Sequence, residues 1–351
     1  MVDLRSDTVT QPTDAMREAM SLADVGDDDY GEDATVNRLQ GLAAGRLGKE
    51  AALFLPSGTM ANLIALLTHT QPGDEVIVEC QAHIYLDEAG GMSALAGVIP
   101  RPVAGERGTI TAAQLEAVLR PPDPHYAPTR LLCLENTHNS AGGTVMTPTA
   151  MAEVCGAAHR RGLRVHLDGA RIFNAAVALG VDVRHLASDA DSVMFCLSKG
   201  LSAPAGSVLL GEAGFVARAR RLRKMLGGGM RQVGVLAAAG IVALETMVER
   251  LEEDHRHAKL LARRLAALPG LGIDPASVQT NIIMVHVADA PRMAQHLAAR
   301  NVLANAEGPK RIRLVTHRHI GAREIDEAVD GFHEMTSLTE LHQGLGGSRD
   351  L

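Results

Sequence analysis

The sequence predicts an α/β fold in which a large domain with a mostly parallel sheet precedes a smaller C-terminal α/β domain. Short apolar runs rich in β-branched residues alternate with helix-like segments, which is the pattern of a parallel sheet. Most of these runs are apolar at every position, as is typical of strands that helices cover on both faces. The 351 residues, 46% apolar and 21% charged, suffice for about two globular domains.

The elements of the large domain follow from these runs and from helix-capping signals. Thr111 and Gln114 form a capping box, which predicts a helix over 115–119. Thr147 followed by Pro148 predicts the start of a helix over 151–161, because proline is favoured at the first helical position. The predicted strands are residues 51–55, 75–79, 97–101, 131–135, 164–167, 192–197 and 207–211.

After residue 211 the pattern changes. A basic helix over 215–226 and three consecutive glycines precede a long helical stretch over 233–268, which Pro269 and Gly270 end. Strand and helix then alternate in the segments 282–287, 290–300, 312–315 and 322–338. We therefore predict an N-terminal segment and large domain over 1–245, a small domain over 246–342 and a tail over 343–351.

Charge and composition exclude several classes of partner. The formal net charge is −7, which disfavours a nucleic-acid backbone or an anionic membrane surface. With five Phe, three Tyr and no Trp, the chain is also poor in the aromatic side chains that stack on single-stranded bases. We therefore expect neither nucleic acid nor membrane among its partners.

The cysteines and the absence of an address predict a cytoplasmic location. The four cysteines lack metal-type spacing, and three of them lie in apolar strand-like runs, so buried reduced thiols are expected. The first residues contain no apolar leader segment, and the longest weakly polar run, over 233–244, is too short to span a bilayer.

Polar side chains follow three of the predicted strands. Asp168 follows the strand over 164–167, Lys199 comes just after the strand over 192–197, and Glu135 ends the strand over 131–135. Because ligands of open parallel sheets bind beyond the carboxyl ends of the strands, these are candidate site residues. A lone charge there is more often a cap or a solvated residue. An amine that leaves an apolar strand, however, is poorly hydrated, as nucleophilic Schiff-base lysines are.

A candidate anion site lies where residues 54–62 run from a strand through a small-residue turn into a helix. Free N–H groups at the helix start, with the hydroxyls of Ser57 and Thr59, would bind an anion, although such turns also begin ordinary helices. The usual nucleotide-binding glycine motifs are missing. His317 and His319 have no supporting carboxylate cluster, so no metal site is predicted.

An anion cradle, a strand-end carboxylate and a strand-end lysine together fit pyridoxal 5′-phosphate (PLP). Its aldehyde needs an amine, its phosphate needs an anion site, and its ring nitrogen needs a carboxylate that keeps it protonated. We therefore predict PLP as the cofactor, with Lys199, Asp168 and the turn at Ser57 as its contacts.

A series of longer motifs spans nearly the whole chain. They are DLRSDTVT (3–10), VGDD (25–28), YGED (30–33), PSGTMAN (56–62), ENTHN (135–139), HLDGAR (166–171), LSKG (197–200) and GGGMRQ (227–232). In this order they closely resemble the low-specificity or allo-type L-threonine aldolases, PLP enzymes of the aspartate aminotransferase-like fold (fold type I). The resemblance implies that fold, with a large PLP-binding domain and a smaller C-terminal domain.

The resemblance implies a role for each cofactor contact. Lys199 corresponds to the lysine that carries the cofactor, and Asp168 to the partner of the ring nitrogen. Arg231 resembles an arginine that a neighbouring subunit contributes to the phosphate, so a homodimer is the minimum and a tetramer is expected. The phosphate cup corresponds to Ser57, Gly58 and Thr59.

The resemblance also implies the residues around the substrate. His83 corresponds to an imidazole stacked on the cofactor ring, and His125 to a second histidine that reaches the substrate hydroxyl. The general base is His83, His125 or a water held by either. The substrate carboxylate is held by a clamp of Ser6, Arg171 and Arg313. Two positions depart from the family pattern: Asp29, usually apolar in relatives, and Asp87, often aromatic.

The activity that the resemblance implies is reversible retro-aldol cleavage of L-threonine, L-allo-threonine and other L-β-hydroxy-α-amino acids to glycine and an aldehyde, acetaldehyde in the case of threonine. A serine hydroxymethyltransferase-like enzyme, a β-eliminating lyase or an aminotransferase would use the same lysine, aspartate and phosphate cup, so these alternatives stay open. A PLP-sensing regulator is disfavoured, because such proteins need an attached DNA-binding module and this chain is acidic.

Overall fold

The computed structural model describes residues 1–346 and divides the chain into two compact units. The larger unit is Gln11–Glu249, and the smaller unit joins Met1–Thr10 to the chain from Arg250 onward. Of the N-terminal segment and large domain expected over 1–245, the first ten residues thus belong to the smaller compact unit. Strand β1 (Val2–Asp3) pairs in parallel with β10 (Val302–Leu303), and Leu4 is fully buried in the smaller unit's core.

The larger unit is built on a seven-stranded sheet with the order β2-β8-β7-β6-β5-β3-β4. Strand β8 is antiparallel to both of its neighbours, and the other pairs are parallel, which confirms the predicted α/β class. The strands are β2 (Ala51–Leu55), β3 (Glu75–Glu79), β4 (Ile99–Val103), β5 (Thr129–Glu135), β6 (Arg164–Asp168), β7 (Ser192–Cys196) and β8 (Ser207–Gly211).

All seven predicted strands of this sheet are present, with bounds that differ by two residues at most. The largest shift is in β4, which pairs with β3 alone and contains Pro100 and Pro102. Proline lacks the N–H group that a central strand needs, so it is tolerated at a sheet edge. The capping box of Thr111 with Gln114 and the N-terminal Pro148 also lie where predicted.

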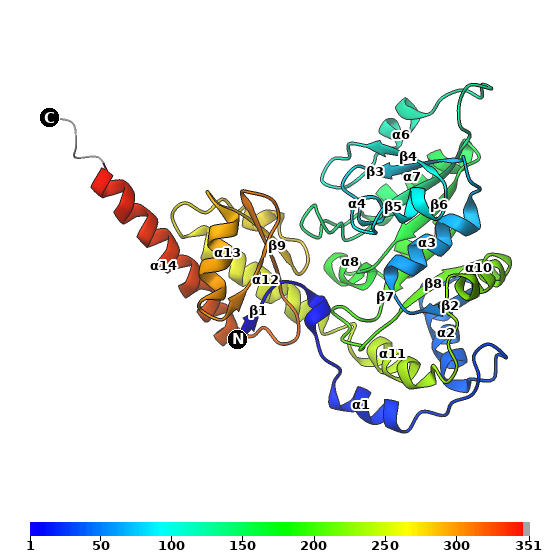
Figure 1. Ribbon diagram of the computed structural model, residues 1–351, viewed down its shortest axis with the longest axis horizontal. Helices are drawn as coiled ribbons and strands as arrows, with labels where there is room; N and C mark the ends of the chain where they lie inside the picture. Colours follow the sequence, from blue (N-terminus) through cyan, green and yellow to red (C-terminus); the bar gives the residue numbers. More distant parts are fainter. Residues whose placement is uncertain (347–351) are drawn as a thin grey trace. The chain divides into compact units, whose positions relative to one another are not determined.

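Helices cover both faces of this sheet (Figure 1). Met194 and Cys196 of β7 pack against α3 (Gly58–His69) on one face, whereas Phe195 meets Phe173 of α8 (Ile172–Leu179) edge to face. The remaining helices of the unit are α1 (Asp14–Ser21), α2 (Ala34–Leu47), α4 (His83–Leu86), α5 (Gly91–Ala94), α6 (Ala112–Val118), α7 (Pro148–Arg160), α9 (Arg184–Ala187), α10 (Ala213–Met225) and α11 (Gly234–Thr246).

The long helical stretch predicted over 233–268 is two helices. Helix α11 ends at Thr246 and α12 begins at Leu251, so the break coincides with the boundary between the units. The first turn of α12 is acidic, which favours the start of a helix because carboxylates stabilise the positive end of the helix dipole. Asp254 in that turn also forms an ion pair with Arg250, the residue before the helix.

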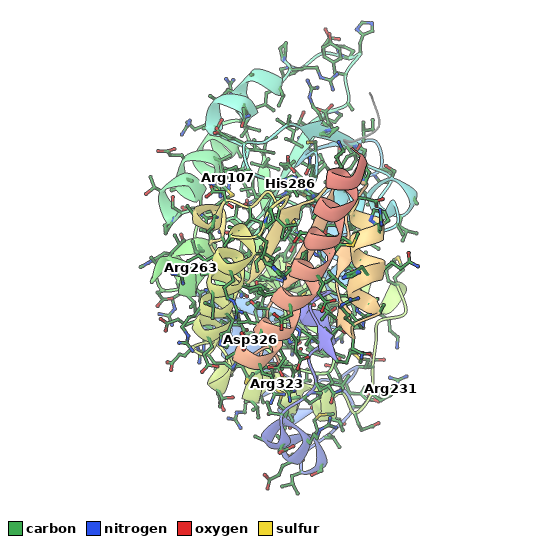
Figure 2. All side chains as sticks on the ribbon, turned by 90° about the vertical axis from the view of Figure 1, so that its left-hand side faces the viewer. Arg107, Arg231, Arg263, His286, Arg323 and Asp326 are labelled. Carbon is green, nitrogen blue, oxygen red and sulfur yellow. The ribbon has the colours of Figure 1, made fainter. Side chains whose placement is uncertain are left out.

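The smaller unit combines an antiparallel sheet of the order β11-β12-β9 with three long helices. Its elements are α12 (Leu251–Ala266), β9 (Ile282–His286), α13 (Ala290–Ala298), β11 (Asn305–Ala306), β12 (Arg311–Val315) and α14 (Ala322–Gly346). Figure 2 shows Asp326 on α14, where it forms an ion pair with Arg264 of α12. The predicted tail overlaps α14 over 343–346, and its last part, 347–351, lies outside the described residues.

Two further expectations concern the cysteines and the possibility of a membrane-spanning helix. All four cysteines are free thiols, and only Cys80 is more than marginally exposed. Among the helices of residues 1–346, none combines the length and the apolar character that a membrane crossing requires.

Candidate active site

Asp168 lies at the carboxyl edge of the sheet, where β6 ends, and is only 3% exposed. Its Oδ1 accepts a hydrogen bond from the backbone N–H of Ala170 at 3.0 Å. Its Oδ2 accepts one from Nδ2 of Asn62 at 2.7 Å. Hydrogen bonds to both oxygens compensate the loss of solvent around this carboxylate and fix its orientation.

The predicted anion cradle is the start of α3, which follows β2 directly. The hydroxyl of Ser57 caps the helix by accepting a hydrogen bond from the N–H of Met60. Ser57 and Thr59 are exposed, so the first N–H groups of a twelve-residue helix face an accessible turn. Gly58 packs closely against β7: a Cβ atom there would lie 3.0 Å from Sγ of Cys196, which is a tight contact.

His83 begins α4, four residues after β3 ends, and two glutamates hold it. Its backbone N–H donates to Oε2 of Glu135 at 2.8 Å, and its Nδ1 lies 3.0 Å from Oε1 of Glu88. The hydrogen bond with Glu88 raises the pKa of His83, and the charge of Asp168 acts in the same direction. Burial and the charge of Lys199 oppose this rise in pKa.

Lys199 follows β7 by three residues and is half-buried. Because β7 runs parallel to β6, both chains leave the sheet at the same edge. The structure thus brings the predicted Lys199, Asp168 and His83 together with the start of α3 at one edge of the larger unit.

Sequence reasoning missed two polar residues of this edge, Asn62 and Glu88. Both are buried, with exposures of 1% and 6%. Asn62 is a polar position within the mostly apolar helix that follows the anion cradle, and this signal could have identified it. Nothing in the sequence around Glu88 distinguishes it from a surface glutamate.

His83, Glu88 and Asp168 present nitrogen and oxygen atoms within 4.8 Å of one another. The NH2 group of Asn62 lies between the two carboxylates, 2.7 Å from each. Since this amide already supplies the positive hydrogens that both carboxylates need, the cluster is a hydrogen-bonded network.

A second cluster of acids and histidine lies at the ends of β3 and β5. Nε2 of His138 is 3.1 Å from Oε2 of Glu79 and 3.8 Å from Oε2 of Glu135. Burial would raise the pKa of Glu79, but hydrogen bonds from His138 and from two backbone N–H groups lower it to about 2. Glu135 also holds the N–H groups of His83 and Asn139, so this cluster supports the loop that carries His83.

Arg171 and Arg231 occupy different surroundings in the larger unit. Arg171 is 6% exposed, immediately precedes α8, and its Nη1 lies 3.4 Å from Oδ1 of Asn139. Arg231 is exposed (Figure 2), and its Nη1 forms an ion pair with Oδ2 of Asp29 at 2.6 Å. The same Asp29 oxygen also pairs with Lys224. The aspartate that departs from the family pattern therefore contacts the predicted phosphate arginine.

His125 does not lie with the other predicted residues of the larger unit. Its ring and its N–H both contact Oδ1 of Asp123 in an exposed loop. The next residue, Tyr126, lies under the guanidinium of Arg120, which pairs with Glu75 at the beginning of β3. The loop is therefore anchored at the amino edge of the sheet, one strand length away from Asp168.

Ser6 and Arg313 belong to the smaller unit. The hydroxyl of Ser6 caps a short 3₁₀ helix over Asp7–Val9 by accepting a hydrogen bond from Thr8. Arg313 lies on β12, where Nη2 donates to the carbonyl of Arg5 at 3.1 Å. Within this unit the two predicted residues are thus connected through adjacent positions of the N-terminal segment.

The residues at the carboxyl edge of the larger unit fit PLP. The start of α3 offers free N–H groups at an accessible turn, where a phosphate can bind. Asp168 is a buried acceptor whose hydrogen bonds hold it in place, as the partner of a protonated ring nitrogen must be. Lys199 supplies the amine at the same edge.

Comparisons with known proteins identify the family of the chain. Residues 3–290 match the family model of beta-eliminating lyases. The chain is 48% identical over 330 residues to the low specificity L-threonine aldolase of Escherichia coli K12, covering 93% of this chain and 97% of that protein. It is 46% identical over 342 residues to low-specificity L-threonine aldolase 1 of Arabidopsis thaliana, covering 95% and 96%.

Solved structures extend the comparison to the fold. A Leishmania major threonine aldolase matches with a TM-score of 0.82 and 20% identity, covering 96% of this chain and all of that one. A Sphingomonas wittichii serine palmitoyltransferase matches with a TM-score of 0.78 and 16% identity, covering 97% and 88%. The fold is that of the fold type I PLP enzymes, as predicted. The chain belongs to the low-specificity L-threonine aldolases within the beta-eliminating lyase family.

Proposed function

We propose that this chain is a PLP-dependent lyase that reversibly cleaves L-threonine, L-allo-threonine and other L-β-hydroxy-α-amino acids to glycine and an aldehyde. The observation that carries the proposal is the grouping of Asp168, His83 and the start of α3 at one sheet edge. That grouping occurs in a chain whose relatives at 46% and 48% identity are named L-threonine aldolases.

When bound, PLP supplies an aldehyde that condenses with amines and a protonated ring that accepts electrons from the substrate α-carbon. Lys199 would provide the amine that holds the cofactor. Asp168 keeps the proton on the ring nitrogen. The N–H groups at Ser57, Gly58 and Thr59 bind the phosphate.

The substrate is oriented and deprotonated by other side chains. Arg171 binds the substrate carboxylate, since its planar guanidinium can make two parallel hydrogen bonds. The orientation that Arg171 imposes on the carboxylate determines which bond at the α-carbon breaks. His83 accepts the proton of the β-hydroxyl, directly or through a water, so that the aldehyde leaves. The assignment of Ser6 and Arg313 to the same carboxylate rests on the resemblance.

Assembly and location belong to the same proposal. If Arg231 binds a neighbouring subunit's phosphate, one chain lacks a complete cofactor site, and a homodimer is the minimal active form. The resemblance favours a tetramer. Four free thiols suit the reducing cytoplasm.

The purified protein, loaded with PLP, should release acetaldehyde from L-allo-threonine without added folate or keto acid. Lys199→Ala should lose the yellow colour of the lysine-bound cofactor and the cleavage activity together. Lys49→Ala is a matched control. Burial lowers the pKa of Lys49, and its Nζ donates to the carbonyl of Ala190 just before β7 begins, at the opposite edge of the sheet. A colourless wild-type protein with full activity would contradict the PLP assignment.

The name of the matched family favours β-elimination as the second candidate. A β-eliminating lyase would convert L-serine to pyruvate, whereas an aldolase acting on the same substrate would release formaldehyde and glycine. Product analysis with L-serine therefore separates the two reactions.

A further inference from the structure

A continuous chain of buried hydrogen bonds lies behind Asp168. Oδ1 of Asn62 is 3.0 Å from Nε2 of His166, whose Nδ1 is 2.9 Å from the hydroxyl of Ser192. That hydroxyl is 2.7 Å from Nε2 of His69. His166 and Ser192 are fully buried, so each polar atom depends on its protein partner.

The orientation of the Asn62 amide determines which atom donates and which accepts in these hydrogen bonds. Its side chain has one end near two carboxylate oxygens and the other near a histidine nitrogen. Only an amide NH2 can donate to two carboxylates, so the carbonyl oxygen must accept from Nε2 of His166. The Nδ1 of His166 then accepts from Ser192. Burial lowers the pKa of His166 to about 4, which agrees with a neutral ring carrying a single proton.

The other branch of the network reaches His83. Oε1 of Glu88 accepts from Asn62 and lies 3.0 Å from Nδ1 of His83, which places the imidazole proton on Nδ1. Nε2 is not used in this hydrogen bond. The charged groups that act on His83 are Glu88, Asp168 and Lys199.

We propose that Asn62 and Glu88 are positioning residues: one amide holds the Asp168 carboxylate toward the cofactor ring and, through Glu88, holds His83 with Nε2 available to accept the substrate proton. The inference rests on the proposed function, in which Asp168 and His83 act on the cofactor and substrate. It adds that the two groups share one support.

The physical need for this amide is electrostatic. The two carboxylates lie close together, and like charges at short distance repel in a poorly solvated site. The two hydrogens of Nδ2 of Asn62 bind one oxygen of each carboxylate. The hydrogen bond that His166 donates to the same amide polarises it and strengthens both of these hydrogen bonds. Removing the amide would therefore disturb the orientation of Asp168 and the basicity of His83 together.

The first experiment separates the charge of Glu88 from its shape. Glu88→Gln keeps an oxygen that can accept from Nδ1 of His83 but removes the negative charge. In the holoenzyme, kcat should fall about 10- to 100-fold with a much smaller change in KM, and the acidic limb of the kcat–pH profile should move to lower pH. Asp191→Asn is the matched control, because Asp191 contacts His159 at 2.9 Å just before β7 begins. It should leave the kcat–pH profile unchanged.

The second experiment compares Asn62→Asp with Asn62→Ala. Asp preserves the volume of the side chain but replaces the donor NH2 by an acceptor oxygen that faces two carboxylates. If the amide acts through its hydrogens, Asn62→Asp should weaken PLP binding and alter the pH dependence of the holoenzyme's visible spectrum at least as strongly as Asn62→Ala. If Asn62 only fills space, Asn62→Asp should resemble the wild type and Asn62→Ala should be worse, which would overturn the proposal.

A measurement on the wild-type protein tests the proposal even if the Asn62 and Glu88 variants fail to fold. ¹⁵N NMR of histidine-labelled holoenzyme, with His83 assigned from the spectrum of His83→Asn, should show the neutral ring protonated at Nδ1. A proton at Nε2 would contradict the proposal. Failure of the proposed function is distinguishable: it would appear as a wild type that binds no PLP or cleaves no β-hydroxy amino acid. Failure of this inference would leave an active wild type whose Glu88 and Asn62 variants keep its pH profile and spectrum.

Discussion

His138 and Glu79 form a buried pair in which Nε2 of the histidine lies 3.1 Å from Oε2 of the glutamate. Their side chains are 2% and 5% exposed. Burial lowers the pKa of His138, but the hydrogen bond to Glu79 and the charge of Glu135 outweigh it, so the net direction is upward. The pair stabilises the loops after β3 and β5, which carry the backbone contacts of His83.

The pH dependence of stability should reveal this pair. Glu79, with its pKa lowered from 4.5 to about 2, contributes stability above pH 4.5 and loses it as the pH falls toward 2. His138, with its pKa raised above 6.5, contributes fully below pH 6.5 and loses its contribution as the pH rises through the raised value. The pair should therefore stabilise most between pH 4.5 and 6.5.

His138→Gln should lower the free energy of unfolding by about 3 kcal/mol within this window, because it leaves a buried glutamate without its charged partner. The loss should shrink at alkaline pH. Urea unfolding at a fixed protein concentration measures both values. An equal loss at all pH values would show that His138 acts through packing rather than through charge.

A side chain at Gly58 should be poorly tolerated. Its Cβ would lie 3.0 Å from Sγ of Cys196 and 3.0 Å from Cε of Met194, so in Gly58→Ala these side chains or the start of α3 must shift by a few tenths of an ångström. We expect a loss of about 1–3 kcal/mol in the free energy of unfolding and weaker PLP binding. Gly45→Ala in α2 is the control, since open space surrounds its Cβ and alanine favours helix. Equal PLP affinity in both variants would contradict a phosphate role for this turn.

Asp29 should compete with phosphate for Arg231. In the structure, Oδ2 of Asp29 contacts both Arg231 and Lys224, and the hydrogen bond with Lys224 lowers the pKa of Asp29. Asp29→Ala should raise the affinity for PLP by up to about fivefold, because an exposed ion pair is weak and easily replaced. Arg231→Ala should lower the affinity. Fluorescence titration of apoprotein with PLP measures both, and a weaker affinity in Asp29→Ala would exclude competition.

The sequence predicted the parts of the fold that depend on local patterns. Strands β2, β3 and β8 match their predicted bounds because their apolar runs end at polar, proline or glycine residues. Strand β1 has two residues, and its partner β10 lies 300 positions away in the sequence, so no local sequence pattern predicts this pairing. Through the same long-range pairing, residues 1–10 belong to the smaller unit.

For the site, motifs identified side chains but not the contacts between them. Asp168, Lys199 and the turn at Ser57 were predicted from their positions at strand ends. Glu88 was not, because its role depends on meeting Asn62 and His83 in space. His125 was predicted from resemblance, and a short motif carries no information about which edge of the sheet, or which copy of the chain, its loop serves.

His125 therefore leads to a prediction about assembly. Its loop is anchored at the amino edge of the sheet through Tyr126 and Arg120, whereas Asp168 and Lys199 lie at the carboxyl edge. If His125 acts on substrate, it must act on the site of another copy. A subunit of Lys199→Ala would then lend its intact His125 to a subunit of His125→Asn, which keeps Lys199. An equal mixture refolded together should regain about a quarter of wild-type activity if the subunits pair at random.

Mixing Lys199→Ala with His83→Asn is the matched control. Lys199 and His83 belong to the same edge of one chain, since the charge of the lysine acts on the pKa of the imidazole. No combination of these two subunits contains both residues at one site, so activity should not return. Differently tagged subunits establish that mixed oligomers form. If they form and the His125→Asn mixture stays as inactive as that variant alone, His125 does not serve a neighbouring site, and the base must be sought among the groups beside Asp168.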